Sequence, residues 1–321
     1  RTVITVHNIE YQGRYGRETV EDLFGLDSGW FDGGTLAFDG DVNLLKGAIV
    51  TADAVTAVSP TYAQELKCAY FAHGLETVMR MNEGKLYGVL NGIDMKRYDP
   101  AHDKALAATY SAGNLAGKKK DKAALQKLLG LQEKSDTPII AMVTRLVSHK
   151  GLDLVCETLD AIMEKDVQFV VLGKGDAKYE TFFEYARARY GGRMAVHLGY
   201  SEQLAMQIYA GADLFLMPSK SEPCGLSQMI AMRYGTLPIV RETGGLKDTV
   251  HAYEAWNGAG NGFSFADYNA GDMCHVVCEA IDLYHNNKTA CAALRKRGMT
   301  ADFSWTRSAK AYNDIYRSIC R

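Results

Sequence analysis

The chain has 321 residues, of which 47% are apolar and 23% are charged, and its formal net charge is −2. This composition is ordinary for a globular protein of one large or two smaller domains, and it excludes a disordered chain. The near-zero charge provides no basic field for nucleic acid or anionic lipid. No apolar run approaches the roughly 18 residues that span a bilayer, so we expect no nucleic-acid partner and no membrane.

The seven cysteines are odd in number and lack the spacing of a disulfide framework. The first residues, Arg1–Asn8, show no basic start, apolar stretch or cleavage site of a signal peptide. The cysteine pattern favours a reduced, cytoplasmic setting.

The first hundred residues have an irregular pattern. Two apolar runs predict strands and a third segment predicts a helix: Val3–Val6, Ala54–Val58 and Thr61–Phe71. Ser59 is a good N-cap for that helix, and Pro60 suits its first turn. The segment Tyr87–Ile93 predicts a strand that ends in a turn, and we place a domain boundary just before it.

Residues 101–136 contain the lysine-rich run Gly117–Lys122. Four lysines in six residues could hold a phosphate or a polyanion. A charge run of this kind is more typical of a solvated helix face, which is the interpretation we favour.

From Thr137 onward, short apolar runs alternate with helix-period segments. The five predicted strands are Pro138–Thr144, Val167–Leu172, Met194–Leu198, Asp213–Met217 and Thr236–Val240. This alternation predicts an α/β fold with a doubly wound parallel sheet. Residues 251–272 are rich in Gly, Asn and aromatic residues and predict an ordered loop insertion. Helices are predicted near 271–287 and 289–298, before an amphipathic segment, Ser304–Ile319.

Polar and glycine-rich residues directly follow these strands. They are Arg145 with Lys150, Gly173–Asp176, Tyr200, Glu222–Ser227 and Thr243–Gly245. Because ligands bind at the carboxyl edge of an open parallel sheet, five strands are expected to deliver these residues to one crevice.

The segment Ser219–Ser227 is the most informative of these. Pro223 restricts the turn, and Gly225 lets the backbone approach a ligand without a Cβ in the way. The amides that follow open a helix, whose N-terminus favours an anion. The alternative to an anion site is a capped helix N-terminus that binds no ligand. The nearby Arg145 and Lys150 provide a planar fork and a point charge, a suitable pair for a diphosphate.

Three other motifs are weaker. The pair Gly173-x-Gly175 lacks the third glycine of a dinucleotide fingerprint, since Lys178 occupies that position. Asp39-Gly-Asp41 imitates a metal-binding Asp-x-Asp but lies outside the crevice, so we predict a loop. Cys274 and Cys278 have no second ligand pair and predict a core helix rather than a zinc site. We therefore expect no metal and no cofactor.

Eight segments, in order over essentially the whole chain, resemble the bacterial glycogen synthases and plant starch synthases. The segments are Thr5–Gly13, Thr56–Tyr62, Gly88–Asp94, Thr144–Asp153, Glu222–Leu226, Tyr234–Pro238, Thr243–Leu246 and Asp302–Trp305. The resemblance implies two Rossmann-like domains that face a cleft (GT-B type). It also implies transfer of glucose from ADP-glucose to the non-reducing end of an α-1,4-glucan, with retention at the anomeric carbon.

The resemblance implies that Arg145 and Lys150 hold the diphosphate and stabilise the charge on the departing ADP. This is electrostatic catalysis without a metal. The amides of Leu226 and Ser227 add to the same task. Tyr200 stacks on the adenine. The Thr243–Gly244 turn completes the substrate-binding set.

The resemblance assigns other residues to the donor glucose. Glu222 and the amides of Cys224 and Gly225 bind its hydroxyls, while Asn91 and His7 approach from the other side. The backbone carbonyl of His7 supports an oxocarbenium-like state. A covalent route would need a carboxylate beside the anomeric carbon. We favour a same-face substitution instead, because Glu222 is already assigned to sugar hydroxyls.

Relatives normally have a further N-terminal stretch with a Lys-x-Gly-Gly-Leu motif, and nothing like it precedes His7. We therefore expect an incomplete first domain over 1–87, a nucleotide-sugar domain over 88–300, and a helix within 301–321 that returns to the first domain. Two alternatives stay open: a truncated non-catalytic protein that binds nucleotide or glucan, and a transferase of the same fold that uses UDP-glucose. The sequence leaves the oligomeric state open.

Overall fold

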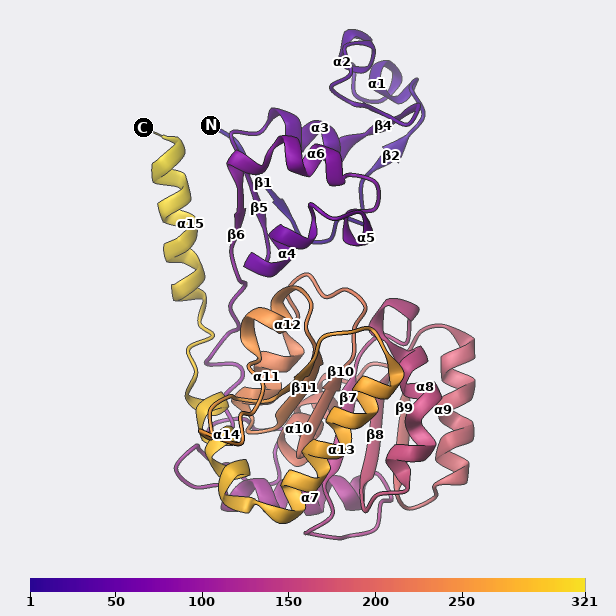
Figure 1. Cartoon of the computed structure of the whole chain (residues 1–321), viewed down its shortest axis with the longest axis vertical. Coiled ribbons are helices and arrows are strands. Elements are labelled where there is room, and N and C mark those ends of the chain that lie inside the picture. Colours follow the sequence, from indigo (N-terminus) through magenta and orange to yellow (C-terminus); the bar gives the residue numbers. More distant parts are fainter. Residues whose placement is uncertain (321) are drawn as a thin grey trace. The chain divides into compact units, whose positions relative to one another are not determined.

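The computed structural model describes residues 1–320. The chain forms two compact units (Figure 1). The first unit contains Arg1–Asn91 and the segment from Thr306 onward, and the second contains Gly92–Trp305.

The first unit is built on a three-stranded parallel sheet in the order β1-β5-β6. Its strands are β1 (Val3–Val6), β5 (Ala54–Ala57) and β6 (Leu86–Gly88). Its longer helices are α3 (Leu44–Thr51), α4 (Pro60–Glu65) and α6 (Glu76–Met81), with the short α5 (Ala69–Ala72) and the 3-10 turn η1 (Glu83–Lys85). A small lobe adds β2 (Arg14–Tyr15), α1 (Thr19–Asp22), α2 (Gly29–Asp32), β3 (Ala37–Phe38) and β4 (Asp41–Asn43).

The last helix, α15 (Trp305–Ile319), packs on this sheet (Figure 1). Ile315 forms an apolar cluster with Ala54 of β5 and Val89, which follows β6. The Ser308 hydroxyl donates to the carbonyl of Leu90 over 2.5 Å. The two ends of the chain thus meet in one unit.

The second unit is a six-stranded parallel sheet in the order β12-β11-β10-β7-β8-β9. The strands are β7 (Ile139–Val143), β8 (Gln168–Gly173), β9 (Met194–Leu198), β10 (Leu214–Met217), β11 (Leu237–Arg241) and β12 (Phe263–Phe265). The helical elements are α7 (Ala116–Leu128), η2 (Ser148–Lys150), α8 (Leu152–Met163), α9 (Ala177–Arg189), α10 (Glu202–Gly211), α11 (Ser227–Arg233), α12 (Gly244–Thr249), α13 (Ala270–Asn286) and α14 (Lys288–Thr300). The predicted α/β class with Rossmann-like units is confirmed.

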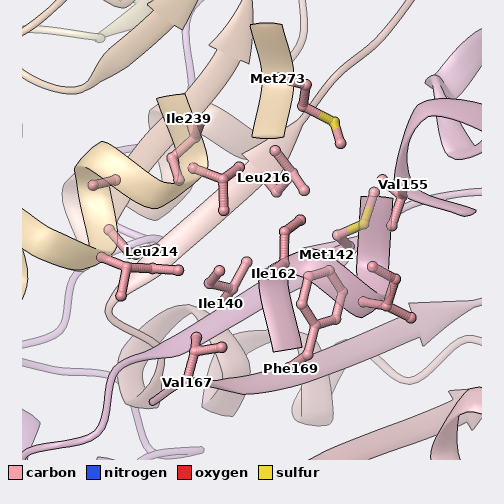
Figure 2. Close-up of a cluster of buried hydrophobic side chains, with 14 of the residues drawn as sticks. Ile140, Met142, Val155, Ile162, Val167, Phe169, Leu214, Leu216, Ile239 and Met273 are labelled. Carbon is pink, nitrogen blue, oxygen red and sulfur yellow. The ribbon is translucent and has the colours of Figure 1, made fainter. Parts of the chain in front are cut away.

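Alternate residues of the central strands face a core shared with α8 and α13 (Figure 2). Ile140 and Met142 of β7 lie there with Leu214 and Leu216 of β10, against Val155 of α8. The intervening residues are also buried, because α10 packs on β7 and α11 packs on β10 and β11. Burial on both faces explains why these strands are continuously apolar.

Each of the five strands predicted after Thr137 is present within one residue of its expected ends. The loop predicted over 251–272 is wrong in part, since Phe263–Phe265 form β12 and α13 already begins at Ala270. A three-residue edge strand is too short to show a period. The helix predicted over Thr61–Phe71 is interrupted, because Cys68 adopts an extended backbone between α4 and α5.

The solvated helix face predicted for Gly117–Lys122 is also wrong in part. Lys119 and Lys120 of α7 are exposed, but Lys118 and Lys122 are buried. The Lys118 ammonium donates to the carbonyls of Ala210 (2.7 Å) and Tyr234 (3.0 Å). Carbonyls at the ends of two helices solvate this amine in place of water.

Candidate functional site

The strand order of the second unit places a switch point between β7 and β10. The chain proceeds outward from β7 to β8 and β9, then returns to β10 and proceeds outward the other way. The loops that leave neighbouring strands at such a point diverge, and ligands of doubly wound sheets bind between them. Lys150 follows β7 and Glu222 follows β10, so the topology itself brings these two side chains together.

The Lys150 ammonium lies 2.7 Å from Oε2 of Glu222, and their side chains are only 16% and 11% exposed. The buried Ser219 hydroxyl donates to the same oxygen over 2.9 Å. Among residues 1–320, no hydrogen bond reaches the other carboxylate oxygen, Oε1. The site therefore combines a fixed cation with a carboxylate that has one oxygen available for a hydroxyl donor.

Backbone contacts hold the loop after β7 against the loop after β10. The Lys220 amide donates to the carbonyl of His149 over 2.9 Å. Gly151 has a φ of +73°, and a Cβ there would lie 2.0 Å from the carbonyl oxygen of Pro218. This close approach explains why glycine follows Lys150. Arg145 is exposed, with its guanidinium 3.4 Å from the ring of His149.

A third loop, after β11, packs against the turn formed by Glu222–Gly225. The Gly245 amide donates to the Glu222 carbonyl over 3.2 Å. Cβ atoms at Gly244 and Gly245 would lie 2.0 Å from the carbonyl oxygens of Glu222 and Cys224. Because these two positions are glycines, the backbone of this loop can contact the backbone of the Glu222–Gly225 turn. Gly225 itself has a φ of +68°, a left-handed conformation that suits glycine.

The remaining predicted residues of the second unit differ in exposure. Tyr200 follows β9 and is 83% exposed, so its ring is accessible. Leu226 is exposed and Cys224 is buried. Ser227 begins α11, and the Thr243 side chain is buried where α12 begins.

His7 and Asn91 belong to the first unit. His7 is exposed directly after β1, and Asn91 is half-buried beyond β6. The Ile9 amide donates to the Tyr62 hydroxyl over 2.9 Å, which fixes the chain just after His7. Both predicted residues lie where strands of this unit end.

The weaker motifs have structural explanations. Cβ atoms at Gly173 and Gly175 would lie 1.9 and 2.3 Å from the carbonyl oxygens of Thr144 and Leu146, so these glycines let two strand-end loops touch. Asp39 and Gly40, both with positive φ, turn the β3–β4 hairpin, and Asp41 pairs with Arg14. Cys274 and Cys278 lie half-buried on α13.

Three residues of the site had no role predicted from the sequence, although Ser219 belongs to the segment singled out there. Ser219 contacts Glu222, and the buried Gln228 amide donates to the carbonyls of Cys224 and Gly225. Arg241 donates to the carbonyl of Lys220 over 2.8 Å. The available signal was a polar residue within or directly after an apolar run, which applies to Ser219 and Arg241. Gln228 gives no such signal.

Comparisons with known proteins identify the family of the chain. Residues 1–81 match the family described as starch synthase catalytic domain, and residues 129–298 match glycosyl transferases group 1. A doubly wound unit with a cation and a carboxylate at its switch point, together with these matches, defines a glycosyltransferase of the GT-B fold.

The relatives narrow the family. The chain is 50% identical over 319 residues to a glycogen synthase of Bacillus cereus (strain ATCC 10987), covering 99% of this chain and 67% of that protein. It is 48% identical over 321 residues to the glycogen synthase of Geobacillus stearothermophilus, covering 100% and 66%. The catalytic domain of starch synthase IV from Arabidopsis thaliana, solved with ADP and acarbose, superposes with a TM-score of 0.93 at 37% identity, covering 99% and 67%. The chain belongs to the glycogen synthase and starch synthase family of glucosyltransferases.

The chain spans about two thirds of the length of these relatives. Among residues 1–320, none of the helices has the length and apolar character needed to traverse a bilayer.

Proposed function

We propose that the chain binds ADP-glucose in its second unit and serves in transfer of glucose to the non-reducing end of an α-1,4-glucan, with retention. The observation that carries the proposal is the contact between Lys150 and Glu222 at the switch point. It offers one group for an anionic leaving group and one for sugar hydroxyls. The similar starch synthase was solved with ADP and acarbose, a nucleotide and a glucan-like molecule.

Lys150 stabilises the departing diphosphate. Its ammonium is shielded from water and is held by Glu222 over 2.7 Å, so it needs little reorganisation when charge develops on the phosphate. Arg145 adds a second cation from the same loop, and the amides of Leu226 and Ser227 complete the phosphate contacts.

Glu222 orients the donor sugar. Its Oε1 accepts from a glucose hydroxyl while Oε2 stays with Lys150 and Ser219. The amides of Cys224 and Gly225 bind neighbouring hydroxyls, and the Thr243–Gly244 turn supports that loop. A same-face substitution then leaves the acceptor proton to the departing phosphate.

The resemblance supplies the other roles in this proposal. Tyr200 stacks on the adenine, which its exposed ring permits. Asn91 and His7 contact the donor sugar, and the carbonyl of His7 supports the oxocarbenium-like state. The proposed setting is cytoplasmic, and no metal takes part.

The test is incubation of the chain with labelled ADP-glucose and a glycogen primer. Label in the polymer supports the transferase, and binding of ADP without incorporation supports the non-catalytic alternative. Thermal unfolding with ADP or UDP distinguishes the nucleotides, because a ligand that binds only the folded state raises the midpoint. Equal or larger shifts with UDP would contradict ADP preference.

A further inference from the structure

Arg241 is the last residue of β11, and its side chain contacts the loop that leads from β10 to Glu222. The residue is 9% exposed. Its guanidinium NH1 donates to the carbonyl of Lys220 over 2.8 Å and lies 3.5 Å from that of Ser219. It thus ties the end of β11 to the loop that follows β10.

A tyrosine ring fixes the other side of this guanidinium. The carbon of the Arg241 guanidinium lies 5.5 Å from the centroid of the Tyr268 ring. The Tyr268 hydroxyl in turn donates to Asp153 over 2.5 Å. Arg241 is therefore held between an anchored ring and two backbone carbonyls, with little freedom to move.

The charge of Arg241 lacks a counterion. None of the ion pairs among residues 1–320 includes it, and its buried Nε–H has no acceptor. The adjacent Glu242 is engaged elsewhere, since it accepts from Ser264 over 2.9 Å and lies 3.6 Å from Lys247. Burying an unpaired charge is unfavourable for folding. Its presence here indicates a role that an apolar side chain of similar size would not fulfil.

The loop that Arg241 holds is the loop that orients Glu222. The same Ser219 whose carbonyl faces Arg241 donates through its hydroxyl to Oε2 of Glu222 over 2.9 Å. A shift of the Ser219–Lys220 backbone would move that hydroxyl and the carboxylate, and with them the ammonium of Lys150.

We propose that Arg241 is a positioning residue for the donor site, which aligns Glu222 through Ser219 and leaves an unpaired positive charge that favours an anionic donor. This inference rests on the proposed function. It predicts that the empty protein gains little from Arg241, whereas the nucleotide-bound protein depends on it.

The test compares Arg241→Met, Arg241→Lys and Arg193→Met in the full chain, by thermal unfolding with and without ADP. Arg193 is a matched control, because its guanidinium also donates to backbone carbonyls, those of Met163 (2.6 Å) and Lys165 (2.7 Å), away from the site. Wild type must first show an ADP-induced rise in midpoint. If it shows none, the proposed function and this inference both fail.

We expect Arg241→Met to unfold within about 3 °C of wild type without ADP, because loss of an unpaired charge offsets loss of hydrogen bonds. Its ADP affinity should fall at least tenfold, and Arg241→Lys should recover part of that loss. Arg193 is only half-buried, so its charge stays hydrated and the loss of that charge does not offset the lost hydrogen bonds. Arg193→Met should therefore show a lower ADP-free midpoint and unchanged affinity. An Arg241→Met protein that follows the Arg193→Met pattern overturns the inference. If Arg241→Met does not fold, an Arg241→Lys affinity within twofold of wild type overturns it.

Discussion

Ion-paired residues in this chain differ in how accessible they are, and the accessibility determines whether a ligand can reach them. Lys150 and Glu222 are matched to each other but reachable. Asp213 is fully buried between Lys122 and Arg295, each with a nitrogen 2.8 Å from one of its oxygens. Lys150 and Glu222 can therefore exchange partners with a ligand, whereas buried Asp213 keeps its two partners and is not accessible to one.

We predict that Lys150→Met lowers transfer by two orders of magnitude or more wherever transfer is measurable. The charge matters most when the leaving group departs, so turnover falls more than glucan binding. ADP-induced stabilisation should fall as well. Lys165→Met is the control, since Lys165 forms an exposed pair with Asp282. Turnover within threefold of wild type would remove Lys150 from the mechanism.

The buried Asp213 predicts a defined acid sensitivity. Burial raises the pKa of its carboxyl, but Lys122 and Arg295 together lower that pKa below the ordinary 3.8. The unfolded chain then binds more protons than the folded one as the pH falls through this range, so stability drops below about pH 5.

Asp213→Asn should remove this part of the pH dependence. It should also cost about 3–5 kcal/mol at pH 7, because two buried cations lose their partner. Urea unfolding at pH 7 and pH 4 measures both effects. Asp282→Asn, which removes an exposed charge, should change stability by about 0.5 kcal/mol or less. Equal losses in the two variants would contradict this account.

At the scale of elements, glycines at strand ends determine how closely the site loops pack. We predict that Gly245→Ala displaces the turn that holds Glu222, because a Cβ would lie 2.0 Å from the Cys224 carbonyl oxygen. The ADP-induced rise in midpoint should disappear, or the ADP affinity should fall more than tenfold. Gly191→Ala, at a position with open space around the Cβ, should behave as wild type. A normal ADP response in Gly245→Ala would show that the turn adapts.

The helix α7 gives a second prediction at this scale. Burial lowers the pKa of the Lys118 amine, which binds carbonyls at the ends of α10 and α11. Lys118→Met should lower the free energy of unfolding by about 1–3 kcal/mol, because it leaves buried acceptors unsatisfied. Lys119→Met, on the exposed face of the same helix, should be nearly neutral in urea unfolding. Equal changes in the free energy of unfolding for Lys118→Met and Lys119→Met would support a solvated helix face instead.

These elements also show which features a sequence can reveal. The strands after Thr137 were predictable because burial on both faces makes them continuously apolar. The positions of Lys150 and Glu222 followed from strand ends. The burial of Lys118 was not predictable, since its partners are carbonyls at the ends of two distant helices. The same holds for Arg241, whose environment consists of the loop after β10 and the ring of Tyr268.

At the scale of the whole molecule, the two units differ in how the chain composes them. The second unit is one continuous segment, Gly92–Trp305, with its own core and the loops of the proposed donor site. The first unit needs both ends of the chain. Its sheet shares an apolar cluster with Ile315 of α15, and Ser308 of that helix bonds to Leu90. The second unit should therefore be independent of the first, but the first should depend on residues beyond 305.

We predict that a fragment of residues 92–305 unfolds cooperatively in urea and keeps the ADP-induced rise in thermal midpoint, within a few-fold in affinity. A fragment of residues 1–91 should show no cooperative transition, because Ala54 and Val89 lose the cover of α15. Joining residues 306–320 to it by a flexible linker should restore the transition, since the helix then binds at high effective concentration. The matched control is the same fusion with Ile315→Asp, which places a charge in that cluster. Loss of ADP binding in the folded 92–305 fragment would mean that groups of the first unit contribute substantially to holding the nucleotide.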